Sequence, residues 1–219
     1  MRLLHLVLVV LAVMSLPPVL VEPVRVAHVT ADDLLGRTRT CTPASVGGYT
    51  TYDGTLADVP VCKAGSAYFW KAGMGIDCDG PATTSCNART DPSYQSQTLC
   101  VPPDCRYLTA EETYYLVIPM PSARFDYRAA GIRPGDVGAV VYGKKVVYAV
   151  FADVGPEARI GEASYAAAKA LGINPDPALG GASSGVTYIV FPGQAPDVIG
   201  DNAAAHQAGA SAAHAFVHS

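Results

Sequence analysis

The chain has 219 residues, of which half are apolar and 16% are charged, and its formal net charge is −4. This length and apolar content suffice for the buried core of one domain with tails. A mildly acidic chain is a poor match for nucleic acid as the main partner and suits a cationic or neutral substrate.

The N-terminus has the pattern of an export signal. Met1-Arg2 precedes a nearly unbroken apolar run from Leu3 to Leu16, which ends at Pro17-Pro18. The run matches the apolar region of a signal peptide, about 7–15 residues, and falls short of the roughly 20 residues of a membrane span. We expect residues 1–28 to be a signal peptide and linker, with an uncleaved anchor as the alternative, and residues 20–40 to be a linker or displaced arm.

Six cysteines follow in the first half of the mature chain: Cys41, Cys62, Cys78, Cys86, Cys100 and Cys105. An even number of cysteines behind an export signal indicates disulfides, although the sequence does not choose the pairing. A zinc site is the weaker alternative, since there is no Cys-x-x-Cys pair and no histidine between the first and last cysteine. We therefore expect a secreted, extracellular protein without a metal ion or other cofactor, and without membrane contact after signal removal.

Between the cysteines, one stretch has the composition of a strand and another that of a long loop. Residues 67–71 are mostly aromatic, which favours a strand. Residues 80–105 are rich in Pro, Asp, Ser and Thr and have little periodicity, so we expect a long loop held by disulfides. Loops longer than about 12–15 residues are often functional.

The second half of the chain has the more regular pattern. Residues 164–171 predict a helix, with Ser164 as its N-cap and Gly172 as its stop. Many strands with one or two short helices favour a mainly β fold with short helices (α+β) and a barrel-like core. The strands are expected from apolar, β-branched runs, of which the middle two form a hairpin: 113–118, 137–142, 146–151 and 185–191.

Beyond Pro196 the composition changes to Ala, His and Gly. Residues 197–219 contain helix-forming alanines but lack a clear apolar stripe, so we expect an Ala/His-rich tail that is solvated or partly disordered. His214 and His218 would share a face if a helix formed, which makes metal binding the minor alternative.

The residues best suited to catalysis lie between positions 149 and 164. An apolar run ends in Asp153, a Gly155-Pro156 turn follows, and Glu162 stands just before the predicted helix. Two carboxyl groups that face one groove can supply the acid and the base or nucleophile of glycosidic bond hydrolysis. On spacing alone, the plainer alternatives are that Glu162 favours the helix dipole and that Asp153 binds turn amides.

The segment Ala152-Asp153-Val-Gly-Pro-(x)3-Ile-Gly-Glu162-Ala-Ser164 closely resembles the signature of the chitosanases of glycoside hydrolase family 75. Gly135–Tyr142, Lys71–Gly80 and Asp91–Thr98 resemble the family's other motifs, and the likeness runs in order from about Tyr49 to Gly193. It implies a chitosanase catalytic domain over residues 41–196, which hydrolyses chitosan internally with inversion at the anomeric carbon. Glu162 would be the general acid and Asp153 the general base. A layout similar to that of double-psi β-barrel glycan enzymes sets the expected core.

Four further residues would hold the substrate. Chitosan is a polycation, and Asp77 and Asp79 would bind its ammonium groups through charge-assisted hydrogen bonds. Gln95 and Gln97, in one of the motifs, would add substrate contacts. For the two aspartates, the alternatives are a simple turn and a fragment of a calcium loop that lacks the bidentate glutamate.

One departure from the family concerns Gly75, where members often carry an acidic residue. We expect this subsite to hold ammonium groups less tightly, so that fully deacetylated chitosan binds more weakly. The rival functions are a non-catalytic polysaccharide-binding barrel and a barrel enzyme that acts on another glycan such as peptidoglycan. Nothing in the sequence requires more than a monomer.

Overall fold

The computed structural model describes residues 28–52 and 54–219, so nearly all of the predicted signal peptide and linker, residues 1–28, lies outside the described part of the chain. The described residues form the following helices and strands: α1 (Ala31–Arg37), β1 (Thr42–Pro43), β2 (Cys62–Ala64), β3 (Ala67–Asp77), β4 (Tyr115–Pro119), β5 (Val137–Tyr142), β6 (Lys145–Gly155), β7 (Glu162–Ser164), α2 (Tyr165–Leu171), β8 (Ala182–Val190) and α3 (Asn202–Val217).

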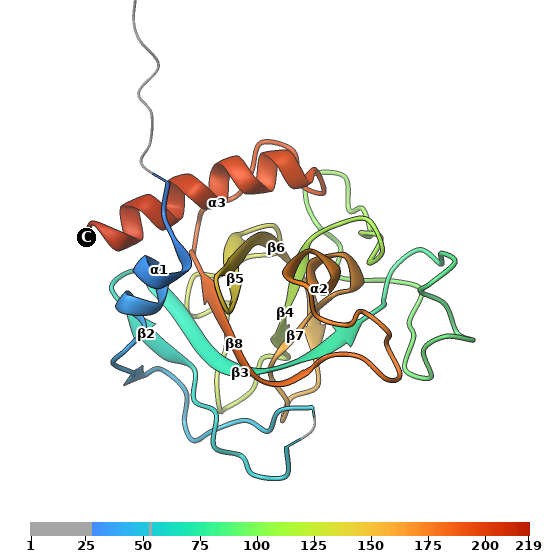
Figure 1. Ribbon diagram of the computed structural model, residues 1–219, viewed down its shortest axis with the longest axis horizontal. Coiled ribbons are helices and arrows are strands. Elements are labelled where there is room, and N and C mark those ends of the chain that lie inside the picture. The colour runs from blue at the N-terminus through green and yellow to red at the C-terminus, as the bar shows by residue number, and fades with distance from the viewer. Residues whose placement is uncertain (1–27, 53) are drawn as a thin grey trace, which may run out of the picture.

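Six of the strands form a closed barrel (Figure 1). Around the barrel the order is β3-β7-β4-β6-β5-β8, and β8 pairs with β3 to complete the ring. The β3–β7 and β4–β6 pairs are parallel, and the other pairs around the ring are antiparallel. β2 extends the sheet from β3 and carries β1 at the edge. This arrangement confirms the predicted mainly β, α+β fold with a barrel-like core.

Alternate side chains of the barrel strands fill its interior. On β6 these are Val147, Ala149 and Phe151, which belong to the same buried cluster as Trp70 and Tyr188. The last two are fully buried and stack with their ring centroids 5.3 Å apart. Because inward and outward side chains alternate along a strand, the residues between these inward ones face the surrounding helices and loops.

The C-terminal helix α3 lies across the outside of the barrel (Figure 1). Asp201 caps the helix by accepting two hydrogen bonds from backbone N–H groups of its first turn. Gly209 packs so closely on β6 that a Cβ at this position would lie 2.5 Å from the Tyr148 ring. The structure therefore differs from the expected solvated or partly disordered tail over residues 197–219. The buried stripe of α3 consists largely of alanine and glycine, which give a weak apolar pattern in the sequence.

Helix α1 is also part of the folded domain. Thr30 and Asp33 form a capping box, in which each side chain accepts the backbone N–H of the other residue. Leu34 is fully buried in a cluster that includes Phe216 of α3. The expected linker or displaced arm over residues 20–40 is thus a packed helix in its described part, because Leu34 has a hydrophobic partner on α3.

The long loop after β3 lies against the outside of β6, as its backbone shows: Leu99 N–H donates to the carbonyl of Ala152 at 2.9 Å. Disulfides hold this loop, as expected from its cysteines. The described chain contains three disulfides, Cys41–Cys62, Cys78–Cys86 and Cys100–Cys105, which confirms the prediction of disulfide bonds and supplies their pairing.

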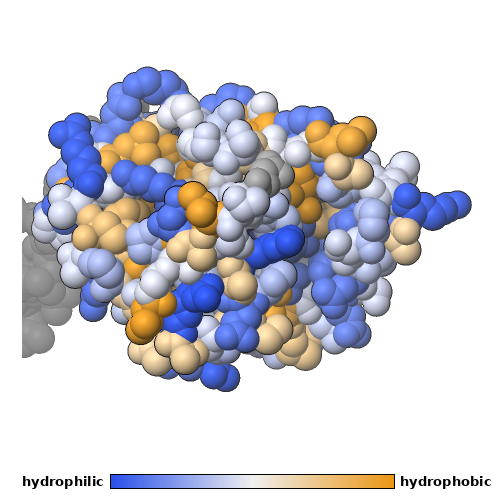
Figure 2. Space-filling view, turned by 90° about the horizontal axis from the view of Figure 1, so that it is seen from below, coloured by the Kyte–Doolittle hydropathy of each residue, from blue (hydrophilic) through white to orange (hydrophobic). Residues whose placement is uncertain are grey.

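None of the helices in the described residues is long and apolar enough to cross a membrane. On the face of the molecule in Figure 2, apolar residues are interspersed with hydrophilic ones. Scattered apolar side chains of this kind are normal on a protein surface. The large exposed ones in the described part of the chain are Val46, Leu56, Met120, Leu179 and Val198.

Candidate active site

Asp153 reaches the outer face of the barrel through an irregularity in β6. Leu116 of β4 pairs with Phe151, but the next residue, Val117, pairs with Asp153, so Ala152 is an extra residue in β6. Phe151 points into the barrel, and simple alternation would send Asp153 the same way. The β-bulge instead places Ala152 and Asp153 on the outer face, and bulges often re-aim side chains beside functional sites.

Glu162 lies on the same outer face, on the other side of β4. It begins β7 and pairs with Val117 of β4 and with Gly75 of β3. Its carboxyl reaches toward β6, where Gly155 has no side chain: a Cβ on Gly155 would lie 2.9 Å from Glu162 Oε2. Because Gly155 is two residues from Asp153, the two carboxyls predicted to be catalytic face one hollow.

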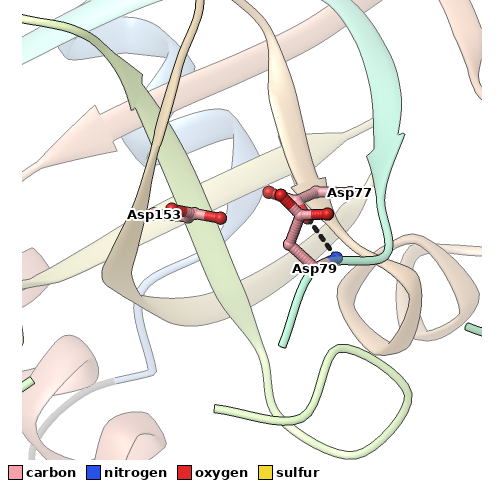
Figure 3. A group of neighbouring side chains, drawn as sticks. All are labelled: Asp77, Asp79 and Asp153. Carbon is pink, nitrogen blue, oxygen red and sulfur yellow. Dashed lines mark hydrogen bonds between the residues drawn. The ribbon is translucent and has the colours of Figure 1, made fainter. Parts of the chain in front are cut away.

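Asp77 and Asp79 come at the end of β3, with their carboxyl groups opposite that of Asp153 (Figure 3). Asp77 Oδ1 accepts hydrogen bonds from the Asp79 backbone N–H at 2.7 Å and from the Tyr115 hydroxyl at 2.9 Å. Asp79 Oδ1 accepts the backbone N–H of Gln95 at 2.6 Å. One carboxylate oxygen from each of Asp77, Asp79 and Asp153 lies within 4.8 Å of the other two, so a single cation could contact all three.

The predicted site residues, with one exception, line a single cleft of about 410 Å³: Asp77, Asp79, Gln95, Asp153 and Glu162. The exception is Gln97, which is exposed and lies outside the lining. The backbone of Gln95 holds Asp79 while the residue itself borders the cleft. The geometry therefore separates two glutamines that the sequence motif grouped together.

Among the other lining residues, three have charged or aromatic side chains and were not predicted as site residues from the sequence: Tyr52, Asp91 and Arg159. Asp91 is buried, and its place at the start of a family motif was the signal that could have identified it. The Arg159 guanidinium lies 5.4 Å from the centroid of the Tyr52 ring. Nothing in the neighbouring sequence marks Tyr52 or Arg159 as a site residue, because their contact joins two loops that are far apart in the chain.

The pKa values of four carboxyl groups in the cleft are raised by burial and by their mutual repulsion. Burial is the main cause that raises the pKa of Asp153 and of Glu162, and repulsion from Asp77 and Asp79 adds to it. Burial and repulsion from Asp77 raise the pKa of Asp79 to about 7, and burial raises that of Asp77 to about 6. Because like charges so close together resist joint ionisation, the cluster retains protons near neutral pH and titrates as a unit.

Such an arrangement can donate a proton, accept a proton and bind a cation. A carboxyl whose pKa is raised can stay protonated near neutral pH and act as a general acid. A cation that enters the cleft favours the ionised forms of the carboxyls around it. An ammonium group fits this description, and so does a hard metal ion such as calcium or magnesium, which prefers oxygen ligands.

Comparisons with known proteins agree with the resemblance of the motifs. A search of curated proteins gave no match. The profile of the family described as fungal chitosanase of glycosyl hydrolase group 75 matches residues 74–218. The matched segment contains Asp153 and Glu162 and continues through helix α3, past the expected domain end at residue 196. Because the match covers more than half of the 219 residues, the chain belongs to the glycosyl hydrolase group 75 family of chitosanases.

Proposed function

We propose that the protein is an endo-chitosanase that hydrolyses β-1,4 linkages between glucosamine units with inversion at the anomeric carbon. The observation that carries the proposal is the pair Asp153 and Glu162, whose carboxyls face one acidic cleft from the two strands that flank β4. Membership of a chitosanase family supports the substrate class.

In this proposal Glu162 is the general acid and Asp153 the general base. Glu162 protonates the glycosidic oxygen as its bond to the sugar breaks, and Asp153 takes a proton from the water that attacks the opposite face. Burial, which raises the pKa of Glu162, keeps the proton on the acid. Asp153 must be ionised to act as base, and substrate ammonium groups beside it favour its charged form.

The spacing of the pair supports inversion. One strand, β4, separates Asp153 from Glu162, and Val117 pairs with both. At about 4.7–4.9 Å between neighbouring strands, their backbones are roughly 10 Å apart. Inverting enzymes hold their carboxyls about 6.5–9.5 Å apart to admit the attacking water, whereas retaining enzymes need about 5–5.5 Å. Side chains that lean toward each other across one strand suit the larger separation.

Asp77 and Asp79 supply the substrate-binding charge in this proposal. Their carboxylate oxygens lie within 4.8 Å of that of Asp153, so an ammonium group held there sits beside the base. Gln95, at the border of the cleft, adds a neutral hydrogen-bonding side chain. Gln97 has no part in the proposal, because it lies outside the lining of the cleft.

The proposed place of action is outside the cell. The three disulfides of the described residues suit an oxidising compartment. The export signal expected over residues 1–28 would direct the chain there. We propose a monomer, since the carboxyl pair and the substrate-binding aspartates all come from one chain.

The test compares the products that wild type and Glu162→Gln release from chitosan, chitin and peptidoglycan. We expect wild type to form reducing ends and a mixture of oligomers from chitosan, and Glu162→Gln to be at least about 10²-fold slower. Glu157→Gln is the matched control, because Glu157 is exposed in the same loop and lies outside the cleft.

Each rival function gives a different result in this assay. Equal hydrolysis of chitosan by wild type and Glu162→Gln would contradict the assignment of Glu162 as the general acid. Binding of chitosan without any cleavage would indicate a polysaccharide-binding barrel. Anhydro products from peptidoglycan would indicate a lytic transglycosylase.

A further inference from the structure

The absence of a side chain on Gly75 leaves room beside Glu162 for another residue. Gly75 and Glu162 are direct partners in the parallel β3–β7 pair, so their side-chain positions are neighbours on the outer face. The ring of Tyr52 packs directly on Gly75 and fills the space that a side chain there would need. A Cβ on Gly75 would be 2.7 Å from Tyr52 Cγ and 2.8 Å from Tyr52 Cδ2. The Tyr52 ring is therefore the side chain that adjoins Glu162 on the β3 side.

The Tyr52 ring is also held by a second loop. The guanidinium of Arg159 lies 5.4 Å from the ring centroid, within cation–π range. Thr50, two residues before the tyrosine, makes two backbone hydrogen bonds of 3.0 Å to the same loop. This loop leads directly into β7, so it fixes Tyr52 relative to the strand that begins with Glu162.

The Tyr52 hydroxyl is suited to act as a donor toward Glu162. Burial, with the negative charge of Glu162 as a smaller cause, raises the pKa of Tyr52 far above its usual value, so the phenol keeps its proton. A donor that faces a carboxylate stabilises the ionised form. Tyr52 accordingly lowers the pKa of Glu162, against the larger effect of burial.

We propose that Tyr52 is a positioning residue for Glu162: its ring, seated between Gly75 and Arg159, directs the hydroxyl to the Glu162 carboxyl and fixes the orientation of that group. The proposal rests on the proposed function, in which Glu162 is the acid. Tyr52 lies before the segment that the family profile matches, residues 74–218, and outside the motifs that carry the resemblance, so neither assigns it a role. An acidic side chain at position 75 and the Tyr52 ring exclude each other, which gives the departure at Gly75 a structural role.

The first test is Tyr52→Phe in the full chain, which keeps the ring and removes the donor. We expect kcat on chitosan to fall about ten- to hundredfold, as for a lost hydrogen bond to a charged group, with little change in KM. The basic limb of the kcat profile should move to higher pH, because Glu162 holds its proton more tightly without the donor. Tyr142→Phe, outside the cleft, is the control. Unchanged kcat and an unchanged pH profile would overturn the proposal.

The second test is Gly75→Ala, which keeps the hydroxyl and pushes the ring off its seat. We expect the same loss of kcat and the same shift of the profile, and the double variant should be no worse than either single one. Gly36→Ala is the control, because a Cβ there meets nothing within 4 Å. If the loss of kcat in the double variant equalled the two single losses combined, Gly75 and Tyr52 would act separately, which would contradict the proposal.

A third measurement separates this proposal from the proposed function. Carbon-13 NMR of glutamate-labelled protein follows the titration of Glu162 without substrate, and Glu162→Gln identifies its signal. We expect Tyr52→Phe to raise the titration midpoint of Glu162. A raised midpoint in a protein that cleaves no glycan would overturn the proposed function alone. An unmoved midpoint and kcat in an active chitosanase would overturn the positioning role alone.

Discussion

The carboxyl of Glu162 occupies the space that a side chain on Gly155 would need. The Oε2 atom is 2.9 Å from the Cβ position of this glycine, which follows Asp153 by two residues on β6. The glycine thus lets a carboxyl from β7 approach the strand that carries the other member of the pair. Since Glu162 is flexible at its end, a side chain on Gly155 would move the carboxyl rather than the backbone.

Gly155→Ala should therefore reduce activity while leaving the fold intact. We expect kcat on chitosan to fall roughly tenfold or more, because a displacement of about 1 Å in a catalytic group is enough for such a loss. Steady-state kinetics and a thermal melt measure the two effects, with Gly36→Ala as the control for a glycine in open space. If Gly155→Ala lowered the melting temperature as well as kcat, the loss of activity would come from unfolding. That result would contradict the proposed role of Gly155 in making room for the Glu162 carboxyl.

The separation of the pair predicts the stereochemistry of the product. Hydrolysis of a β-linked glucosamine oligomer should first give the α-anomer, because water attacks the face opposite the leaving group. Proton NMR during the first minutes, before mutarotation mixes the anomers, distinguishes the two outcomes. A β-anomer as first product would mean that Asp153 or Glu162 attacks the sugar directly, at the shorter separation of a retaining enzyme.

The buried carboxyls should make the protein less stable as pH rises. Burial, with repulsion from Asp77, raises the pKa of Asp153 above the unfolded value of about 3.9. Between the two values the folded protein holds a proton that the unfolded chain has released, so the free energy of unfolding falls from about pH 4 toward pH 8. We expect Asp153→Asn to raise it by on the order of 2 kcal/mol at pH 8 and to change it little at pH 4. Urea unfolding at both pH values measures the difference.

Asp126→Asn is the matched control for this prediction. Asp126 is on the surface, and its hydrogen bond with Arg128 lowers its pKa, so the sign of its linkage is opposite. This variant should bring no stabilisation at pH 8. An equal gain for Asp153→Asn at both pH values would show that the effect comes from packing and not from ionisation.

The sequence predicted those helices and strands that are marked by a pattern within their own residues. The strands β5, β6 and β8 follow apolar, β-branched runs, and α2 begins and ends at its predicted caps, Ser164 and Gly172. Helix α3 was not predicted as a packed element, because alanine and glycine give little contrast between buried and exposed faces. Its burial depends on the outer face of β6, which lies far away in sequence.

In the candidate site, too, local motifs predicted some residues, while other features depend on contacts between segments that are far apart in the sequence. Asp153, Glu162, Asp77 and Asp79 follow from motifs, and the structure brings them into one cleft. The bulge that turns Asp153 outward depends on how β6 pairs with β4, which no local pattern records. Tyr52 likewise becomes relevant only when β3 and β7 bring Gly75 beside Glu162.

Asp79 should contribute to substrate affinity through its charge. Asp79→Asn keeps the shape and an oxygen that can accept the backbone N–H of Gln95, but it removes the charge that would bind an ammonium group. We expect KM for chitosan to rise roughly tenfold, the effect of losing a hydrogen bond between charged groups, with a smaller change in kcat. Added salt should weaken wild type more than the variant, and highly acetylated oligomers, which carry fewer ammonium groups, should show a smaller difference. Asp58→Asn, at an exposed aspartate outside the cleft, is the control. If KM for chitosan were the same in wild type and Asp79→Asn at low salt, Asp79 would have only the turn-forming role that its position after Asp77 also allows.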